Sequence, residues 1–355
     1  MIRRGVWRVR KRRDIPPGRR CVKNKWVFKI KRDGVYRARL VACGYSQIAG
    51  VDFIANFAPV VHDASFRIVL IAILVFAFKA KIVDVITAFL YGDLEEEVYM
   101  DCPEGLDNVG NDDCVELKKA IYGLVQAARQ FWKKFVEKLK LVGFEGGSVD
   151  PCLYVKRSNL GICIVCWHVD DAIFAGDKEA VEDAVESLKR VGFELKVNDD
   201  FKDYLSCEVL VDKSRKMAWL GQPHLLKKLD IKFGDKVKDL QEYRTPGSPG
   251  MGIIRPKDIE PKVDEEQHNL FRSGVGMLLY LVKYSRPDIA NATRELSKVM
   301  DGPTEAAMKE LFRLVKFVLD TKDKGLRMVP ESLDKEAKWS LKLFCDSDFG
   351  GDKDN

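Results

Sequence analysis

The sequence has no apolar run long enough to cross a membrane. Its longest such run, residues 68–78, lies between Arg67 and Lys79, whereas a spanning helix needs about 20 apolar residues. The basic start is not followed by an apolar stretch, so a secretory signal peptide is not expected. These absences predict a soluble, intracellular protein that acts without a membrane.

The chain also has little that would bind zinc. Cys163 and Cys166 have C-x-x-C spacing, but they lie in the run GICIVCWHV, which predicts a strand whose positions i and i+3 face opposite sides. No second pair of cysteines or histidines has zinc spacing. We therefore expect buried, reduced thiols, as in other intracellular proteins. Internal repeats and low-complexity tracts are also absent.

Positive charge is abundant only at the start of the chain. The first twenty residues carry nine Lys or Arg and one Asp, a net charge of +8, and the whole chain carries +6, so the remaining 335 residues are close to neutral. Residues 1–20 are thus predicted to form a basic tail. Two interpretations stay open, a tail that contacts phosphates or directs nuclear entry, and a solvated, frayed end.

Apolar periodicity predicts an α+β architecture. Residues 25–47 alternate around Asp33 and Gly34, which predicts a hairpin with one apolar face and one face lined by Lys29, Lys31, Arg37 and Arg39. The other expected elements are a buried helix at 65–79, a strand at 81–85, an amphipathic helix at 118–142, a hairpin at 161–176, a helix from Asp177 to Gly192, and strands near 193–197 and 205–211. This order is typical of an α+β domain with an antiparallel sheet.

The C-terminal part has a different character. After residue 245 the composition is typical of a loop until about residue 265, and helices are then expected near 267–283, 287–300 and 304–320. The final segment WSLKLFCDSDFGG is predicted to be a strand that begins another domain.

Three aspartates stand at the ends of apolar strands. Asp170 and Asp171 lie where two apolar arms meet, and Asp84 ends the short strand KIVDV. Adjacent carboxylates repel each other and lose hydration there unless a cation neutralises them. If the two strands are neighbours, the carboxylates converge at one edge, an arrangement that suits Mg²⁺. An isolated Asp-Asp is more often a solvated turn, so this signal depends on its surroundings.

The surroundings carry a specific resemblance. VDVITAFLYGDLEEEVYMDCPEGL, AIYGLVQAARQFW and CWHVDDAIFAGD resemble the successive catalytic motifs of copia-type retrotransposon reverse transcriptases. Upstream, KWVFKIKRDGVYRARLVACGYSQ and FAPVV resemble the fingers. Downstream, RTPGS, FRSGVGMLLYLVKYSRPDIANATRELS and VLDTKDKGL resemble the rest of the polymerase region, and CDSDFGG resembles the opening of the ribonuclease H domain. The match covers about residues 22 to 355 in the family's order.

The resemblance implies the right-hand fold of reverse transcriptases and an RNA-directed DNA polymerase that adds dNTPs to a primer on an RNA or DNA template. It implies two Mg²⁺ ions, with Mn²⁺ as a substitute. Asp84 and Asp170 would bind both ions most directly, and Asp171 would support them. It also implies association with other products of the retrotransposon polyprotein, in a cytoplasmic virus-like particle, the nucleus or both.

Several residues inherit nucleotide-binding roles from the resemblance. Phe89 stands at the place of the aromatic steric gate that rejects ribonucleotides by shape, and the less favoured alternative is a core aromatic on a strand-to-helix turn. Gln126 matches the glutamine that touches the incoming nucleotide. The alternative interpretation is an exposed polar group at a helix start. Arg39, and secondarily Lys31 and Lys29, would contact the triphosphate. The alternative interpretation is that these residues form a charged outer face of the hairpin.

The sequence departs from the family at five positions around these motifs. His168 replaces the usual Tyr before Val-Asp-Asp, Ala128 stands where Pro is frequent, and Val125 stands where Lys is frequent. Ser206 replaces a Gly near the place where the primer terminus is gripped, and Cys43 replaces a basic residue. The metal-binding carboxylates all remain, which is compatible with catalysis, while the substitutions suggest relaxed selection in an old insertion.

The resemblance also divides the chain. Residues 21–245 would be the fingers and palm, 246–335 a mostly helical thumb or connection, and 336–355 a truncated start of the ribonuclease H domain. Asp346 would be the first carboxylate of that second site. Its remaining acidic residues would lie beyond Asn355, so ribonuclease H activity is not expected.

Two alternatives to an active polymerase remain. The first is a catalytically decayed relic of the same fold that still binds nucleic acid. The second is a protein-interaction scaffold whose basic tail is a localisation signal. Template–primer binding without incorporation favours the former, and no binding above a neutral control favours the latter.

Overall fold

The chain divides into two compact units. The computed structural model describes residues 1–30, 34–212, 214, 216–248, 262–334, 336, 338–340 and 342. The first unit combines Met1–Phe66 with Lys79–Asp199, and the second combines Arg67–Phe78 with Asp200–Asn355. The boundary expected at residue 245 therefore lies inside the second unit, because strands and a helix that follow Asp200 pack with the C-terminal helices.

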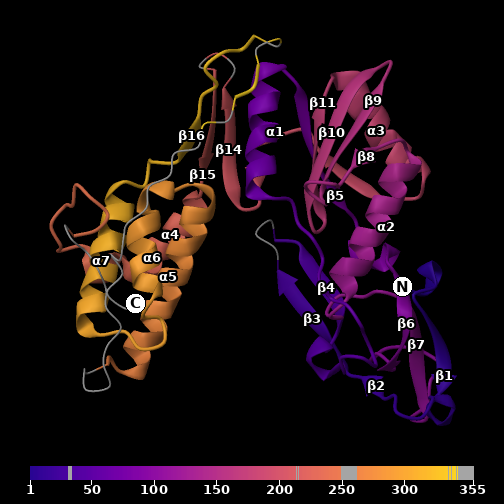
Figure 1. The fold of residues 1–355 in the computed structure, drawn as a ribbon. Helices are drawn as coiled ribbons and strands as arrows, with labels where there is room; N and C mark the ends of the chain where they lie inside the picture. The colour runs from indigo at the N-terminus through magenta and orange to yellow at the C-terminus, as the bar shows by residue number, and fades with distance from the viewer. Residues whose placement is uncertain are drawn as a thin grey trace. The chain divides into compact units, whose positions relative to one another are not determined.

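An antiparallel sheet, here called the palm sheet, organises the first unit (Figure 1). Its strand order is β12 (Leu195–Asn198), β5 (Lys79–Val85), β11 (Asp171–Gly176), β10 (Gly161–His168), β9 (Leu153–Ser158) and β8 (Glu145–Gly146). Helix α3 (Lys178–Arg190) packs against β10 and β11, and Ile173, Phe174 and Cys163 are fully buried. The predicted hairpin, the strand that ends at Asp84 and the helix after Asp177 are confirmed. Burial raises the pKa of the Cys163 thiol to about 12, so this thiol is protonated at neutral pH.

The amphipathic helix expected at 118–142 is shorter than predicted. Helix α2 spans Ala127–Leu141, and the expected start instead belongs to strand β7 (Asp113–Lys119) and the turn that follows. Gly123 lies in that turn with φ +90°, which a right-handed helix does not accept. The periodic apolar pattern therefore holds only from residue 127 onward.

The basic N-terminal segment is folded. Strand β1 (Trp7–Lys11) pairs with β7 in a sheet of order β1-β7-β6-β2, with β6 at Asp93–Asp101 and β2 at Cys21–Val22, and short helices η1 (Ile2–Arg4) and η2 (Arg12–Asp14) flank β1. Val6 is fully buried, and Arg10 and Lys11 form ion pairs with Glu116 and Asp113. The structure differs here from the predicted tail because acidic residues on β7 neutralise the charge, so the segment can pack.

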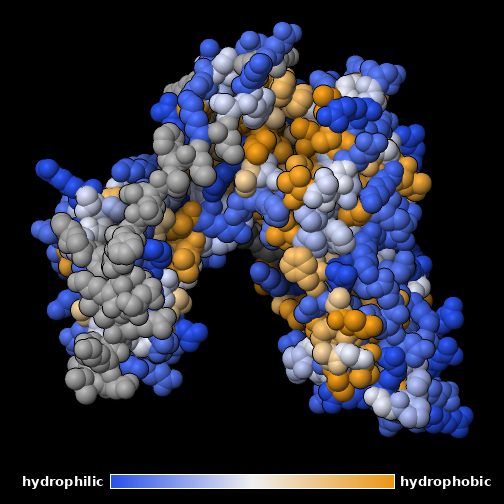
Figure 2. Space-filling model, viewed as in Figure 1, coloured by the Kyte–Doolittle hydropathy of each residue, from blue (hydrophilic) through white to orange (hydrophobic). Residues whose placement is uncertain are grey.

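The predicted fingers hairpin is present. Strands β3 (Asn24–Ile30) and β4 (Tyr36–Ala42) pair antiparallel, with η3 (Gly44–Ser46) following. The register pairs Phe28 with Ala38 and Ile30 with Tyr36 on one face, and Lys29 with Arg37 on the other. The apolar face is exposed at Phe28, Ile30 and Tyr36, and Figure 2 shows hydrophobic side chains at the surface near this hairpin. The basic face is thus confirmed for its described members, and Lys31 lies outside the described residues.

The second unit joins a helical bundle to a small sheet. The helices are α4 (Pro223–Val237), α5 (Glu265–Tyr284), η5 (Pro287–Ile289), α6 (Ala290–Ser297) and α7 (Glu305–Asp320), and helix α1 (Asp63–Val75) is shared between the units. The sheet has the order β13 (Asp203–Tyr204), β14 (Cys207–Asp212), β15 (Met217–Gly221) and β16 (Leu326–Met328). Phe233, Phe271 and Leu311 are fully buried in one apolar core. The three helices expected after residue 265 are confirmed, whereas α4 was not predicted.

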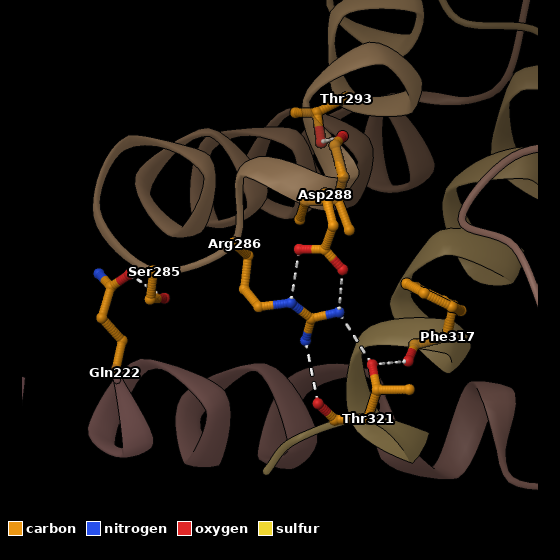
Figure 3. A network of polar contacts seen from close by, with 8 residues as sticks. Gln222, Ser285, Arg286, Asp288, Thr293, Phe317 and Thr321 are labelled. Atoms are coloured by element: carbon orange, nitrogen blue, oxygen red, sulfur yellow. Dashed lines mark hydrogen bonds and ion pairs between the residues drawn. The ribbon is translucent and has the colours of Figure 1, made fainter. Parts of the chain in front are cut away.

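A buried arginine ties this bundle together (Figure 3). The Arg286 guanidinium donates two hydrogen bonds to the Asp288 carboxylate, at 2.9 Å each, and two more to the Thr321 carbonyl and hydroxyl. Nearby, the Ser285 hydroxyl donates to Gln222 Oε1 at 2.7 Å. The network therefore joins the segment after α5 to the ends of α4 and α7.

These elements confirm the α+β class, with an antiparallel palm sheet and a mostly helical second unit. None of the helices in the described part of the chain has the length and apolar character that a bilayer crossing requires. Asp346 and the strand expected around it lie outside the described residues.

Candidate active site

The palm sheet brings two of the three predicted carboxylates into register. Asp84 on β5 and Asp171 on β11 are directly paired across the antiparallel ladder. Paired residues of neighbouring strands project their side chains from the same face of a sheet. Asp170 precedes Asp171 in the turn, and its carbonyl accepts a hydrogen bond from the Val85 backbone N–H at 3.3 Å. The three residues predicted from sequence therefore lie at one end of the palm sheet.

The turn that carries Asp170 has a strained backbone. Val169 has φ +60°, in the left-handed region that β-branched residues avoid. Its neighbour His168 pairs with Asp171 at the end of β10. Such strain costs on the order of 1–3 kcal/mol and persists where surrounding structure imposes it, as the buried β10 and β11 do here. Strained residues of this kind cluster at functional sites.

The side chains that the structure describes do not form a ready-made metal site. Across the described residues, no group of three or more His, Cys, Asp or Glu side chains is arranged to hold a metal ion. The backbone placement of Asp84, Asp170 and Asp171 thus agrees with the predicted site, and their role as metal ligands stays a prediction.

A tyrosine that the sequence analysis did not single out lies beside these carboxylates. The pKa of Tyr122 is raised, first by burial and then by the charges of Asp170 and Asp84, while Arg37 opposes the shift. Asp84 and Asp170 are therefore close enough to act on one phenol. Tyr122 is within the motif AIYGLVQAARQFW, so the only available signal was its place in that segment.

Phe89 lies on the short helix η4 (Ala88–Tyr91) that follows β5. Its ring is half-buried and packs on Tyr122, with ring centroids 4.7 Å apart. The N-terminal segment stabilises the turn before Phe89. Arg4 donates a hydrogen bond to the Thr87 hydroxyl at 2.9 Å and forms an ion pair with Glu194 at 2.5 Å. Thr87 itself has φ +55°. The structure therefore places the predicted gate residue on a braced turn beside the carboxylates.

Gln126 is fully buried, and both ends of its amide are engaged. Its Oε1 accepts from Gln47 Nε2 at 3.0 Å, and its Nε2 donates to the Asp52 carbonyl at 2.8 Å. Gln47 Oε1 also accepts from the Val125 N–H at 2.8 Å. Gln126 is thus not an exposed group at a helix start. A nucleotide contact by Gln126 stays a prediction.

The basic face of the fingers hairpin reaches the same residues. The Arg39 guanidinium lies over the Tyr122 ring, 4.6 Å from its centroid. Lys29 and Arg37 share that face of the hairpin through their register. Among the candidate phosphate-binding residues, the structure therefore brings Arg39 to the tyrosine beside Asp84 and Asp170.

Ser206 provides a test of one departure from the family pattern. It has φ +60°, a conformation that glycine adopts at no steric cost and other L-residues adopt at about 1–2 kcal/mol. Ser206→Gly is therefore expected to raise the free energy of unfolding by about 1 kcal/mol, measured by urea denaturation monitored by circular dichroism. Ser158→Gly, on strand β9 and without positive φ, is the control and should be neutral or destabilising. Equal effects at both positions would contradict the strain argument.

Comparison with known proteins identifies relatives over most of the chain. Residues 5–229 match the family described as reverse transcriptase (RNA-dependent DNA polymerase). The retrovirus-related Pol polyprotein from transposon TNT 1-94 of Nicotiana tabacum is 31% identical over 353 residues, which cover 96% of this chain and 26% of the relative. The corresponding polyprotein from transposon RE2 of Arabidopsis thaliana is 31% identical over 349 residues, covering 96% and 23%.

More distant similarities have the same character. The truncated transposon Ty1-A Gag-Pol polyprotein of Saccharomyces cerevisiae is 27% identical over 342 residues, covering 92% of this chain and 28% of the relative. The chain thus spans about a quarter of the length of these curated relatives. Among solved structures, a foamy viral protease-reverse transcriptase in complex with double-stranded DNA aligns with a TM-score of 0.42 and 12% identity, covering 90% of this chain and 46% of that one.

Proposed function

Because this chain belongs to the reverse transcriptase (RNA-dependent DNA polymerase) family and is of the copia type, we propose that it is an RNA-directed DNA polymerase. It would add dNTPs to the 3′-hydroxyl of a primer on an RNA or DNA template. The observation that carries this proposal is the palm register, which pairs Asp84 with Asp171 beside the turn that holds Asp170.

The donor set of this site fits hard divalent cations. Asp84, Asp170 and Asp171 offer carboxylate oxygens, the ligands that Mg²⁺ prefers when phosphates complete its shell. We expect Asp84 and Asp170 to hold two Mg²⁺ ions, with Asp171 in support and Mn²⁺ as a substitute. When bound, such ions lower the pKa of the attacking hydroxyl and offset charge on the leaving pyrophosphate. By fixing where these cations lie, the carboxylates would align the primer terminus with the triphosphate.

The residues around Tyr122 would select and orient the nucleotide. The Arg39 guanidinium, fixed over the Tyr122 ring, has N–H groups available in a planar fork that suits phosphate oxygens. Phe89 would occupy the space that a ribose 2′-hydroxyl needs, so that rNTPs clash. Gln126 would support the pocket through its bonds to Gln47 and Asp52.

Template and primer would be held through their backbones. Lys29, Arg37 and Arg39 form one basic face on the fingers hairpin. Cationic side chains of this kind release counterions from nucleic acid, so binding would be independent of sequence and would weaken as salt rises.

Primer extension tests the proposal directly. The folded protein should incorporate dTTP on poly(rA)/oligo(dT) in Mg²⁺, and EDTA should stop incorporation. Well-folded protein that incorporates nothing in either Mg²⁺ or Mn²⁺ contradicts the proposal.

A second candidate is a nucleic-acid-binding relic of the same fold. Ser206 in a glycine-like conformation, together with His168 before the carboxylates, favours it. Salt-dependent binding of the template–primer without incorporation would identify this state, and no binding above a neutral control would point to the scaffold.

A further inference from the structure

Tyr122 joins three segments that are far apart in the sequence. Its ring contacts the Arg39 guanidinium of β4, which lies 4.6 Å from the ring centroid. It also contacts the Phe89 ring of η4, with 4.7 Å between centroids and planes inclined by 59°. Contacts at these distances are favourable for both a cation and a tilted aromatic partner. One side chain therefore touches both the proposed phosphate-binding arginine and the proposed sugar gate.

The backbone around Tyr122 is clamped to β4. The Ala42 N–H donates to the Tyr122 carbonyl at 2.8 Å. A Cβ on Gly123 would lie 2.1 Å from the Ala42 carbonyl oxygen, and one on Gly44 would lie 2.2 Å from the Gly123 carbonyl oxygen. These two backbone segments approach so closely that only glycine fits at position 44 or 123. The backbone at Tyr122 is consequently held close to the end of the fingers strand.

The Tyr122 phenol is also subject to the charges of the proposed catalytic carboxylates. Asp170 and Asp84 both act on the Tyr122 phenol, and Arg37 acts on it with the opposite sign. Tyr122 is half-buried, so part of its surface remains accessible. Core tyrosines such as Tyr204, by contrast, are almost fully covered.

We propose that Tyr122 is a positioning residue for nucleotide selection, which backs the Phe89 ring and holds Arg39 over the triphosphate. This inference rests on the proposed polymerase function. With the ring of Tyr122 in place, Phe89 cannot retreat from a 2′-hydroxyl, so a ribonucleotide meets a rigid surface. Without it, the gate ring gains room to move, and discrimination between dNTPs and rNTPs falls.

The test compares kcat/KM for dTTP and UTP on poly(rA)/oligo(dT). Tyr122→Leu removes both ring faces and should lower the dTTP/UTP ratio by about tenfold, the discrimination typical of a loosened apolar contact, and should raise KM for dTTP. Tyr122→Phe keeps the ring and should hold the ratio within about twofold of wild type. In a Phe89→Val background, Tyr122→Leu should lower the ratio no further, because it acts through the gate.

Tyr243→Leu is the matched control. Tyr243 stacks with Arg313, 4.2 Å from the guanidinium to the ring centroid, in the second unit. Its loss removes the same kind of contact and should leave the dTTP/UTP ratio unchanged. An unchanged dTTP/UTP ratio in Tyr122→Leu would overturn the inference. So would a loss in the Phe89→Val background as large as the loss that Tyr122→Leu causes in wild type. In both cases, incorporation by the wild-type protein would still support the polymerase function. No incorporation by the wild-type protein would overturn both.

Discussion

Replacing Asp170 with asparagine is expected to abolish primer extension, lowering kcat by at least about a thousandfold. The substitution keeps the shape of the side chain, removes its negative charge and exchanges one acceptor oxygen for an NH₂ donor. Metal-assisted charge stabilisation is worth several kcal/mol in the transition state, and each 1.36 kcal/mol corresponds to a factor of ten in rate. Asp84→Asn should have a similar effect, since Asp84 lies at the same end of the palm sheet.

A surface carboxylate of the same unit controls for the loss of charge alone. Asp199 is largely exposed and pairs with Lys81 at 2.8 Å. An exposed pair contributes little, so Asp199→Asn should leave dTTP incorporation within about twofold of wild type. Asp170→Asn protein that is folded by circular dichroism and keeps a tenth or more of the activity would show that Asp170 does not have the proposed role.

Measuring template–primer binding by Asp170→Asn distinguishes a loss of catalysis from a loss of nucleic-acid recognition. The cationic face of the fingers hairpin is unchanged in Asp170→Asn, so template–primer affinity and its salt dependence should match those of wild type. If binding and incorporation fell together, the loss would reflect the fold of the site rather than its chemistry.

Replacing Arg286 with methionine is expected to lower the free energy of unfolding of the second unit by about 3–5 kcal/mol. The Arg286 side chain is 1% exposed, and all its hydrogen bonds go to Asp288 and Thr321. Methionine fills similar volume without donors, so the half-buried Thr321 loses the hydrogen bonds that Arg286 donates to its carbonyl and hydroxyl (Figure 3). Asp288 is 41% exposed and regains water, which favours the lower end of the range.

Urea denaturation monitored by circular dichroism measures this effect. Arg294 serves as the control, because its side chain is 68% exposed and pairs with Glu295 at 2.9 Å. Arg294→Met should cost less than about 1 kcal/mol. Arg286→Lys should fall between the two, since lysine keeps the charge but cannot form the two-pronged contact with Asp288. If Arg286→Met lowered the free energy of unfolding no more than Arg294→Met, the Arg286 network would not stabilise the bundle as proposed.

Local patterns in the sequence predicted much of the fold. Alternation around Gly34 predicted the fingers hairpin, and the stripe after Asp177 predicted α3, because side-chain periodicity is set by backbone geometry within one element. The same logic failed at residues 118–126, where Gly123 turns the chain. It also failed at residues 1–20, where charges on β7 neutralise the basic strand.

The sequence by itself determined the family, most of the element types and the identity of three aspartates at strand ends. The tertiary structure alone decided that Asp84 pairs with Asp171, that Gln126 is buried against Gln47, and that Tyr122 joins Arg39 to Phe89. Partners such as these come from segments that are distant in the chain. Periodicity within one segment specifies which face is apolar, but the partner depends on strand register and on close approaches such as that at Gly123. The three aspartates could therefore be named from sequence, whereas their arrangement required the fold.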